Sequence, residues 1–120
     1  MCIRDRKDGI DKSSYQLDSA NSDDALRQIE GDLKDGADMI MIKPGLTYLD
    51  IISKTKDKYN VPIVAYNVSG EYSMIKNGIK NRIFNENILK EIMISFKRAG
   101  ASAIVSYFAI EYIEKFINQK

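Results

Sequence analysis

The chain has 120 residues, of which 44% are hydrophobic and 29% charged, and this composition predicts one modest globular domain. Its formal net charge of +1 provides no global field that would attract nucleic acid or an acidic membrane surface, so we expect neither as a partner. It contains no histidine and one cysteine, Cys2, which excludes a histidine zinc site, a Ser-His-Asp triad and an internal disulfide within these residues.

Residues 1–14 are polar and aperiodic, so we expect a loop or a frayed terminus there. The first residues lack the apolar core of a signal peptide, and no apolar run in the chain approaches the roughly 18 residues that cross a bilayer. We therefore expect a cytoplasmic protein.

The first predicted helix begins at Asn21 or Ser22, either of which can cap it, and runs to about Lys34. Asp23 and Asp24 would lie at its positive end. Gly36 ends it. Its apolar face consists of residues at three- and four-residue spacing, which are Ala25, Leu26, Ile29 and Leu33.

Residues 39–42 are an apolar run that ends in Lys43 and a Pro-Gly turn. Consecutive large apolar residues without alternation are typical of a parallel strand that is covered on both faces. Lys43 is therefore predicted at the C-terminal end of a strand, where β/α barrels carry their chemistry. Burial disfavours the charged form of a lysine, and a neutral amine can attack a carbonyl carbon to form a Schiff base. The alternative is that Lys43 only ends the strand and extends its ammonium to water.

Helices and strands alternate through the rest of the chain with short connections, which predicts an α/β fold with parallel strands and right-handed crossovers. The expected elements are a helix from about Leu49 to Tyr59, a strand at 62–66, a loop or helix entry at 68–72 followed by a short helix or irregular segment to about 82, a helix at 86–98, a strand at 103–107 and an amphipathic helix at 110–117.

Two of the predicted strands echo each other in sequence, as GADMIMIK (36–43) and GASAIVSY (100–107). The echo predicts Lys43 and Tyr107 at equal heights on one end of the sheet, with Ser69 after the middle strand on the same rim. Strand ends that converge in this way are typical of a binding site. The alternatives are that Tyr107 is a buried strand tyrosine and that Ser69 caps the segment beginning at Gly70. Three strands cannot close a barrel of about eight, so the sequence looks like part of a larger β/α protein.

Several motifs occur together in order, and through them the chain resembles the C-terminal third of the delta-aminolevulinic acid dehydratase family, also called porphobilinogen synthases. The resemblance runs from about residue 14 to residue 117. It implies a partial (β/α)8 TIM barrel with about three C-terminal strands, formed by residues 14–120, and leaves residues 1–13 as a lead that is either outside the family or disordered. The motifs are Tyr15-Gln16, GADMIMIKPGLTYLDI (36–51), AYNVSGEYSMIK (65–76), FKRAGA (96–101) and SYFA (106–109).

The resemblance implies a homo-octameric enzyme that condenses two molecules of 5-aminolevulinate to porphobilinogen, with loss of water, in tetrapyrrole and heme biosynthesis. Lys43 matches the Schiff-base lysine of the family, and Ser69 and Tyr107 match residues that hydrogen-bond the carboxylate of that substrate. Lys12 and Gln16 fall at positions that help to hold the second substrate. Most relatives have arginine at the position of Lys12, and lysine keeps the charge without the bidentate fork.

The resemblance also implies zinc or magnesium as a cofactor, but no metal ligand is assigned in this chain. The metal loop of the family and its second active-site lysine match no part of the 120 residues. Gln28 stands where many bacterial relatives carry a glutamate near an allosteric magnesium, and a neutral amide binds a hard cation less well than a carboxylate. We therefore assign no magnesium regulation.

Two other functions stay open at this point. The chain could belong to a different lysine-dependent, aldolase-type barrel, which would need another set of substrate anchors. It could also be an inactive truncated barrel that serves only as an association module. If the chain does belong to the resembled family, we expect the isolated 120 residues to be inactive, because one catalytic lysine, the metal loop and about five strands of that family are not among them.

Overall fold

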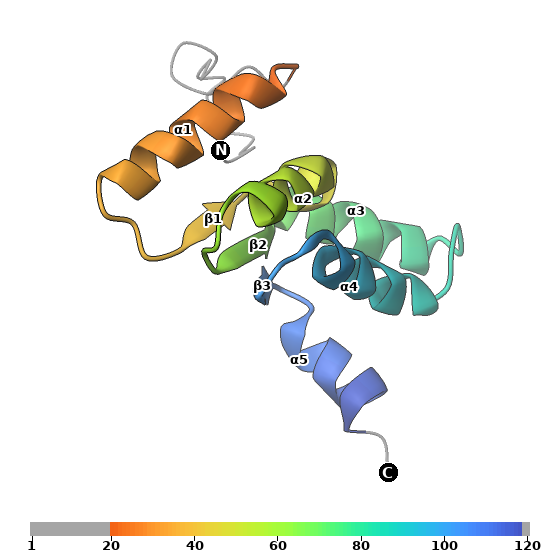
Figure 1. Cartoon of the computed structure of the whole chain (residues 1–120). Helices are drawn as coiled ribbons and strands as arrows, with labels where there is room; N and C mark the ends of the chain where they lie inside the picture. Colours follow the sequence, from red (N-terminus) through yellow and green to blue (C-terminus); the bar gives the residue numbers. More distant parts are fainter. Residues whose placement is uncertain (1–19, 119–120) are drawn as a thin grey trace.

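The computed structural model describes residues 20–118 as one parallel three-stranded sheet with helices, in the strand order β1-β2-β3 (Figure 1). This confirms the predicted α/β class, with strands and helices alternating along the chain. The elements are α1 (Ser22–Lys34), β1 (Ile40–Ile42), the 3-10 turn η1 (Leu46–Tyr48), α2 (Leu49–Lys58), β2 (Ile63–Asn67), α3 (Ser69–Lys80), α4 (Asn87–Ala99), β3 (Ala103–Ser106), α5 (Ala109–Tyr112) and the π-helical turn η2 (Ile113–Ile117).

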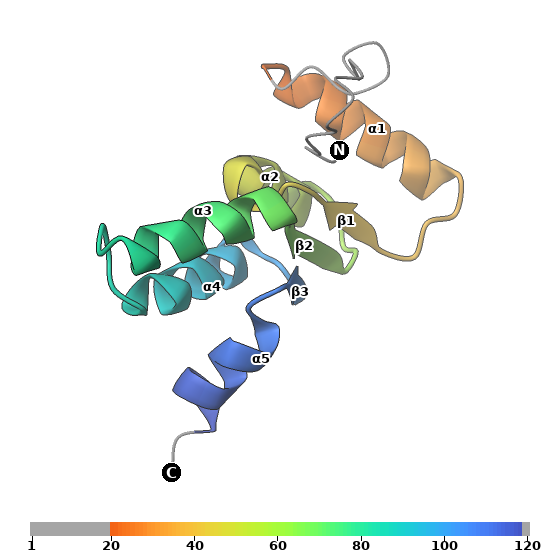
Figure 2. The ribbon, with the colours of Figure 1, turned by 180° about the vertical axis from the view of Figure 1, so that it is seen from behind.

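Helix α1 begins and ends as its sequence predicts. Asn21 is its cap, because the Asn21 Oδ1 atom accepts hydrogen bonds from the N–H groups of Asp23 and Asp24 at 3.1 and 3.2 Å. The chain leaves the helix through Gly36, whose φ of +98° lies in the region that favours glycine. Seen from behind, α1 lies beside β1 and α5 extends away from β3, at opposite ends of the sheet (Figure 2).

One face of the sheet carries the core. Ile40 and Ile42 of β1 and Ile63 and Ala65 of β2 are buried together with apolar residues of the helices. The partners are Ile29 of α1, Ile51 and Ile52 of α2, Ile75 of α3, Leu89, Ile92, Met93 and Phe96 of α4, and Phe108. Burial of this apolar surface is the main term that holds the strands to the helices.

The opposite face is open within the described residues. It is formed by the alternate strand residues, which are Met41, Val64, Tyr66, Ala103 and Val105. Met41 is 48% exposed and Val105 41% exposed. The prediction that the strand at residues 39–42 is covered on both faces therefore holds for one face of β1 only within the described chain, because three strands do not close on themselves.

Two segments differ from their predicted secondary structure. Residues 69–80 form the complete helix α3, where the sequence predicted a loop or helix entry and then a short helix or irregular segment. Two glycines weaken the local helix signal, but Gly78 is buried where a side chain would collide with the Phe84 ring, so packing overrides propensity. The final predicted helix divides into α5 and the π-helical turn η2.

Helix α4 lies against α2 and ends at Gly100, whose φ is +123°. A Cβ atom at this position would lie 2.7 Å from Cβ of Lys56, so the turn into β3 requires glycine both for its backbone angle and for space. Among residues 20–118, none of the helices has the length and apolar content that crossing a membrane demands.

Candidate active site

The residues predicted to form a site follow the C-terminal ends of the three strands. Lys43 follows β1, Ser69 begins the helix after β2, and Tyr107 follows β3. Both strand pairs are parallel, so these ends share one edge of the sheet. In β/α folds this edge is where ligands bind.

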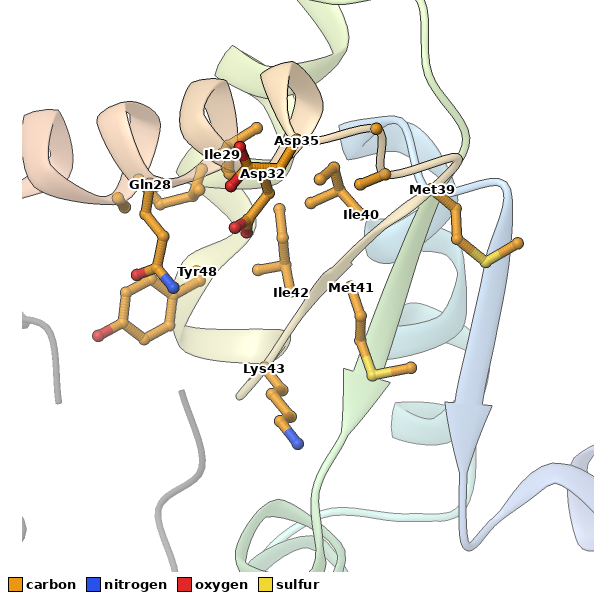
Figure 3. A pocket seen from close by; sticks show the side chains of 14 residues that line it. Gln28, Ile29, Asp32, Asp35, Met39, Ile40, Met41, Ile42, Lys43 and Tyr48 are labelled. Carbon is orange, nitrogen blue, oxygen red and sulfur yellow. The ribbon is translucent and has the colours of Figure 1, made fainter. Parts of the chain in front are cut away.

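Lys43 is half-buried and continues the open-face alternation of β1. Extending the register by one residue sets it beside Tyr66, and its Nζ atom lies 5.8 Å from the centroid of the Tyr66 ring. This is within the range of a cation–π interaction. Figure 3 shows the Lys43 side chain extending past the end of β1.

The turn after Lys43 is fixed by direct packing. The peptide bond to Pro44 is cis, and Pro44 is fully buried. The Gly45 N–H donates to the Tyr66 carbonyl at 2.7 Å, and a Cβ at Gly45 would lie 2.7 Å from the Phe96 ring. The backbone beside Lys43 is therefore held by both β2 and α4.

The sequence echo predicted Lys43 and Tyr107 at equal heights along the sheet, but the hydrogen-bond register places them two residues apart. Val64 is the partner of both Met41 and Ala103, so by extension Val105 is level with Lys43, and Tyr107 lies two residues further along. The reason is the longer connection before β1, since five residues separate α1 from β1 whereas three separate α4 from β3. The sequence echo aligned the glycines and could not detect this difference.

Ser69 and Tyr107 are both exposed, and Tyr107 has 61% of its surface accessible. The alternative of a buried strand tyrosine is therefore wrong for the described chain. The Tyr107 ring packs against Tyr72 of α3, with centroids 5.5 Å apart. The alternative role of Ser69 as a cap is also wrong, because Val68 is the cap of α3 and Ser69 is its first residue.

A hollow of about 500 Å³ lies between α1 and β1 (Figure 3). Lys43, Met41 and Tyr48 line it, together with Gln28 and Asp32 of α1. Gln28 is the residue that stands where many bacterial relatives of the resembled family carry a glutamate. It thus lines the same hollow as Lys43. Lys12 and Gln16 lie outside the described residues, so their predicted roles stay predictions.

A buried carboxylate, Glu71, is the main feature that the sequence prediction missed. Glu71 is 6% exposed and accepts hydrogen bonds from Asn67 Nδ2 at 2.8 Å and from the Leu46 N–H at 3.0 Å. Burial raises the pKa of the Glu71 carboxyl, while the bonds from Asn67 and from backbone N–H groups act against that rise. One signal was present in the sequence, since a glutamate three residues after a helix cap is typical of the capping box.

The described residues do not fit a metal centre. Between residues 20 and 118, no group of three or more histidine, cysteine, aspartate or glutamate side chains could hold a metal ion.

Comparison with known proteins gives consistent matches. A sequence model of the family described as delta-aminolevulinic acid dehydratase matches residues 3–115. Proteins of that name from Archaeoglobus fulgidus and Staphylococcus epidermidis are 51% identical over 105 residues and 54% identical over 109 residues. Each alignment covers 88% of this chain and 33% or 34% of the relative, so the chain spans about a third of their length.

A solved structure also matches. It is the delta-aminolevulinic acid dehydratase (porphobilinogen synthase) of Toxoplasma gondii in complex with its reaction product porphobilinogen. The TM-score is 0.85 and the identity 46%, over 88% of this chain and 30% of that one. The partial barrel predicted from the sequence therefore agrees with the fold of a known barrel segment.

Proposed function

Because this chain belongs to the delta-aminolevulinic acid dehydratase family, we propose that it supplies the Schiff-base lysine of a porphobilinogen synthase. The parent protein would condense two molecules of 5-aminolevulinate to porphobilinogen. Within it, residues 14–120 would be the C-terminal portion of the β/α barrel. The lead at residues 1–13 and the cytoplasmic location stay predictions of the sequence.

The observation that carries the proposal is the position of Lys43. It stands at the C-terminal end of β1, on the open face, with its ammonium beside the Tyr66 ring. The neutral amine of Lys43 would attack the ketone carbon of 5-aminolevulinate, loss of water would leave an imine, and uptake of a proton from solvent would give the iminium. An iminium withdraws electrons better than a ketone, so it would activate the adjacent carbon for condensation with the second substrate.

Ser69 and Tyr107 are the proposed anchors of the substrate carboxylate. Both present exposed side chains after the neighbouring strand ends, and a hydroxyl can donate a charge-assisted hydrogen bond to a carboxylate. Ser69 also lies in the first turn of α3, where the helix dipole favours a negative charge. The proposed roles of Lys12 and Gln16 toward the second substrate rest on the family resemblance.

The cofactor and the assembly are carried over from the family in the same way. We propose zinc or magnesium as the metal and a homo-oligomer, octameric in the family, as the assembly. Since the described residues do not fit a metal centre, the steps proposed above use only side chains of this chain.

The test is reductive trapping. The 120-residue chain is incubated with 5-aminolevulinate and sodium borohydride, and the adduct is located by intact-mass and peptide analysis. We expect an adduct on Lys43 that is lost in Lys43→Ala and kept in Lys54→Ala, which removes an exposed lysine of α2. Absence of an adduct in a sample that is folded by circular dichroism would overturn the proposal and favour the association module.

A second arm tests the carboxylate anchors. Aminoacetone presents the same aminoketone without the carboxylate arm. We expect the unsubstituted chain to form adduct with 5-aminolevulinate at lower concentrations than with aminoacetone. Ser69→Ala and Tyr107→Phe should each reduce this preference, because each removes one hydroxyl donor. An unchanged preference in both variants would exclude these residues as anchors.

A further inference from the structure

A polar network, buried at Asn67 and Glu71 and partly buried at Ser106 and Leu46, joins the C-terminal ends of all three strands. The Phe108 N–H donates to Ser106 Oγ at 3.1 Å, and Ser106 Oγ donates to Asn67 Oδ1 at 2.9 Å. Asn67 Nδ2 in turn donates to Glu71 Oε1 at 2.8 Å, and the Leu46 N–H donates to Glu71 Oε2 at 3.0 Å. The network thus includes the turn after each strand.

Every hydrogen in this network points toward Glu71. The amide of Asn67 accepts from Ser106 at its oxygen and donates to Glu71 at its nitrogen, so the donor-to-acceptor direction is the same in both bonds. The chain of donors ends at a group whose two oxygens both accept, and an ionised carboxylate provides two such oxygens without a proton of its own. The backbone N–H groups of Val68 and Thr47 also favour the charged form of this carboxylate and act to lower its pKa.

The network lies behind the site and not in it. Asn67 is fully buried on the covered face of β2, whereas the preceding residue, Tyr66, contacts Lys43 from the open face. The proposed chemistry gives Glu71 no proton to transfer and no substrate to hold. A buried carboxylate without such a task costs desolvation energy, which its hydrogen bonds must offset.

We propose that Glu71 is a positioning residue, whose carboxylate holds the turns that carry Lys43, Ser69 and Tyr107 in fixed mutual positions. Glu71 accepts a hydrogen bond directly from Leu46 in the turn after Lys43. It is connected to the turn at Tyr107 by the hydrogen bonds of Asn67 and Ser106. Ser69 lies in the same first turn of α3 as Glu71. This inference rests on the proposed function, since it assigns the three turns to one substrate site.

The experiment compares the 120-residue chain with three variants. In Glu71→Gln the new side chain has one accepting oxygen and one donating NH2 group. Either Asn67 Nδ2 or the Leu46 N–H must therefore face this NH2 group instead of an acceptor. The double variant Glu71→Gln with Asn67→Asp exchanges the two groups, so that the new amide at position 71 can donate to the new carboxylate at position 67, which still accepts from Ser106. Thr55→Val is the matched control, because it removes the buried hydrogen bond from Thr55 to the Ile51 carbonyl without touching the turns.

Two measurements are made on each variant. Amide hydrogen exchange, followed by NMR without substrate, reports the N–H groups of Leu46 and Phe108, with the amides of Ile52 and Phe96 as core references. Borohydride trapping with 5-aminolevulinate reports the rate of adduct formation at Lys43. A global loss of stability would accelerate all four amides together, whereas loosening of the turns accelerates the first two selectively.

In Glu71→Gln we expect exchange at Leu46 and Phe108 to accelerate selectively by about tenfold or more, and trapping to slow by about tenfold. The double variant should restore both, and Thr55→Val should show neither change. Acceleration confined to Leu46, equal acceleration at all four amides, or an unchanged trapping rate would each overturn the proposal. Failure of the unsubstituted chain to form an adduct would instead overturn the proposed function, while the substrate-free exchange pattern would still decide whether Glu71 couples the turns.

Discussion

Replacing Asn67 by aspartate places two carboxylates in contact inside the core. The Asn67 Nδ2 atom lies 2.8 Å from Glu71 Oε1, and Asn67 has no exposed surface. In Asn67→Asp an oxygen replaces this donor. The bond from Ser106 can still form, so the substitution changes one contact and leaves the shape of the side chain nearly unchanged.

The cost can be worked out by two routes. Two unit charges about 4 Å apart repel by about 4 kcal/mol at an effective dielectric constant of roughly 20. The pair can instead hold one proton, which costs about 1.4 kcal/mol for each pH unit above the ordinary carboxyl pKa of roughly 4. At pH 7 this is also about 4 kcal/mol, and at pH 5 it is about 1.4 kcal/mol. We therefore expect Asn67→Asp to lose about 4 kcal/mol of unfolding free energy at pH 7.

The sign of the pH dependence follows from proton binding. Burial already raises the pKa of the Glu71 carboxyl, and a second carboxylate in contact raises the pKa of the pair further. The folded variant then binds a proton more tightly than the unfolded chain does, so its stability rises as the pH falls. The deficit relative to the unsubstituted chain should shrink by about 2.8 kcal/mol between pH 7 and pH 5, which is two pH units at about 1.4 kcal/mol each.

Urea unfolding followed by circular dichroism at pH 5, 6 and 7 measures this deficit. If the variant is already unfolded at pH 7, recovery of its helical signal on acidification gives the same information. The control is Asn77→Asp on the exposed side of α3, which should stay within about 0.5 kcal/mol at each pH. A deficit below about 1 kcal/mol, or one that does not change with pH, would refute the role of Asn67 as the donor to Glu71.

Three further predictions concern the turns and the whole chain. Gly45→Ala should lower the unfolding free energy by about 1–3 kcal/mol in urea unfolding and slow the trapping of Lys43, because the added methyl group collides with the Phe96 ring; an unchanged midpoint would show that the turn yields freely. Gly100→Ala should also lower the unfolding free energy by about 1–3 kcal/mol, because position 100 has a positive φ and a Cβ there would collide with Lys56. The trapping rate of Lys43 in the folded fraction should stay unchanged. A slower rate in that fraction would contradict the view that Gly100 affects stability and not the site. The purified 120-residue chain should release no porphobilinogen from 5-aminolevulinate in a colorimetric assay, and turnover would refute the assignment of essential groups outside it.

The sequence predicted the elements whose signals are local and continuous. The apolar runs before Lys43 and Tyr107 and the cap at Asn21 led to the correct strands and helix, since each signal lies within a few residues. The relative height of Lys43 and Tyr107 was not predictable in this way, because it depends on connection lengths that only strand pairing reveals. Glu71 was missed for the same reason, since its partners Leu46 and Asn67 meet it only in the folded chain.

The contact between Gly45 and Phe96 bears on how sequence variation in this protein is interpreted. Phe96 is a residue of α4 that is fully buried in the hydrophobic core, yet its ring fills the space beside the turn that follows Lys43. A survey of variants that scores activity alone would therefore rank Phe96 among the active-site residues, although it presents no reactive group. Scoring abundance and activity side by side would separate the two contributions, and the gap between the scores at Phe96 would measure how far the hydrophobic core governs Lys43, the proposed Schiff-base lysine.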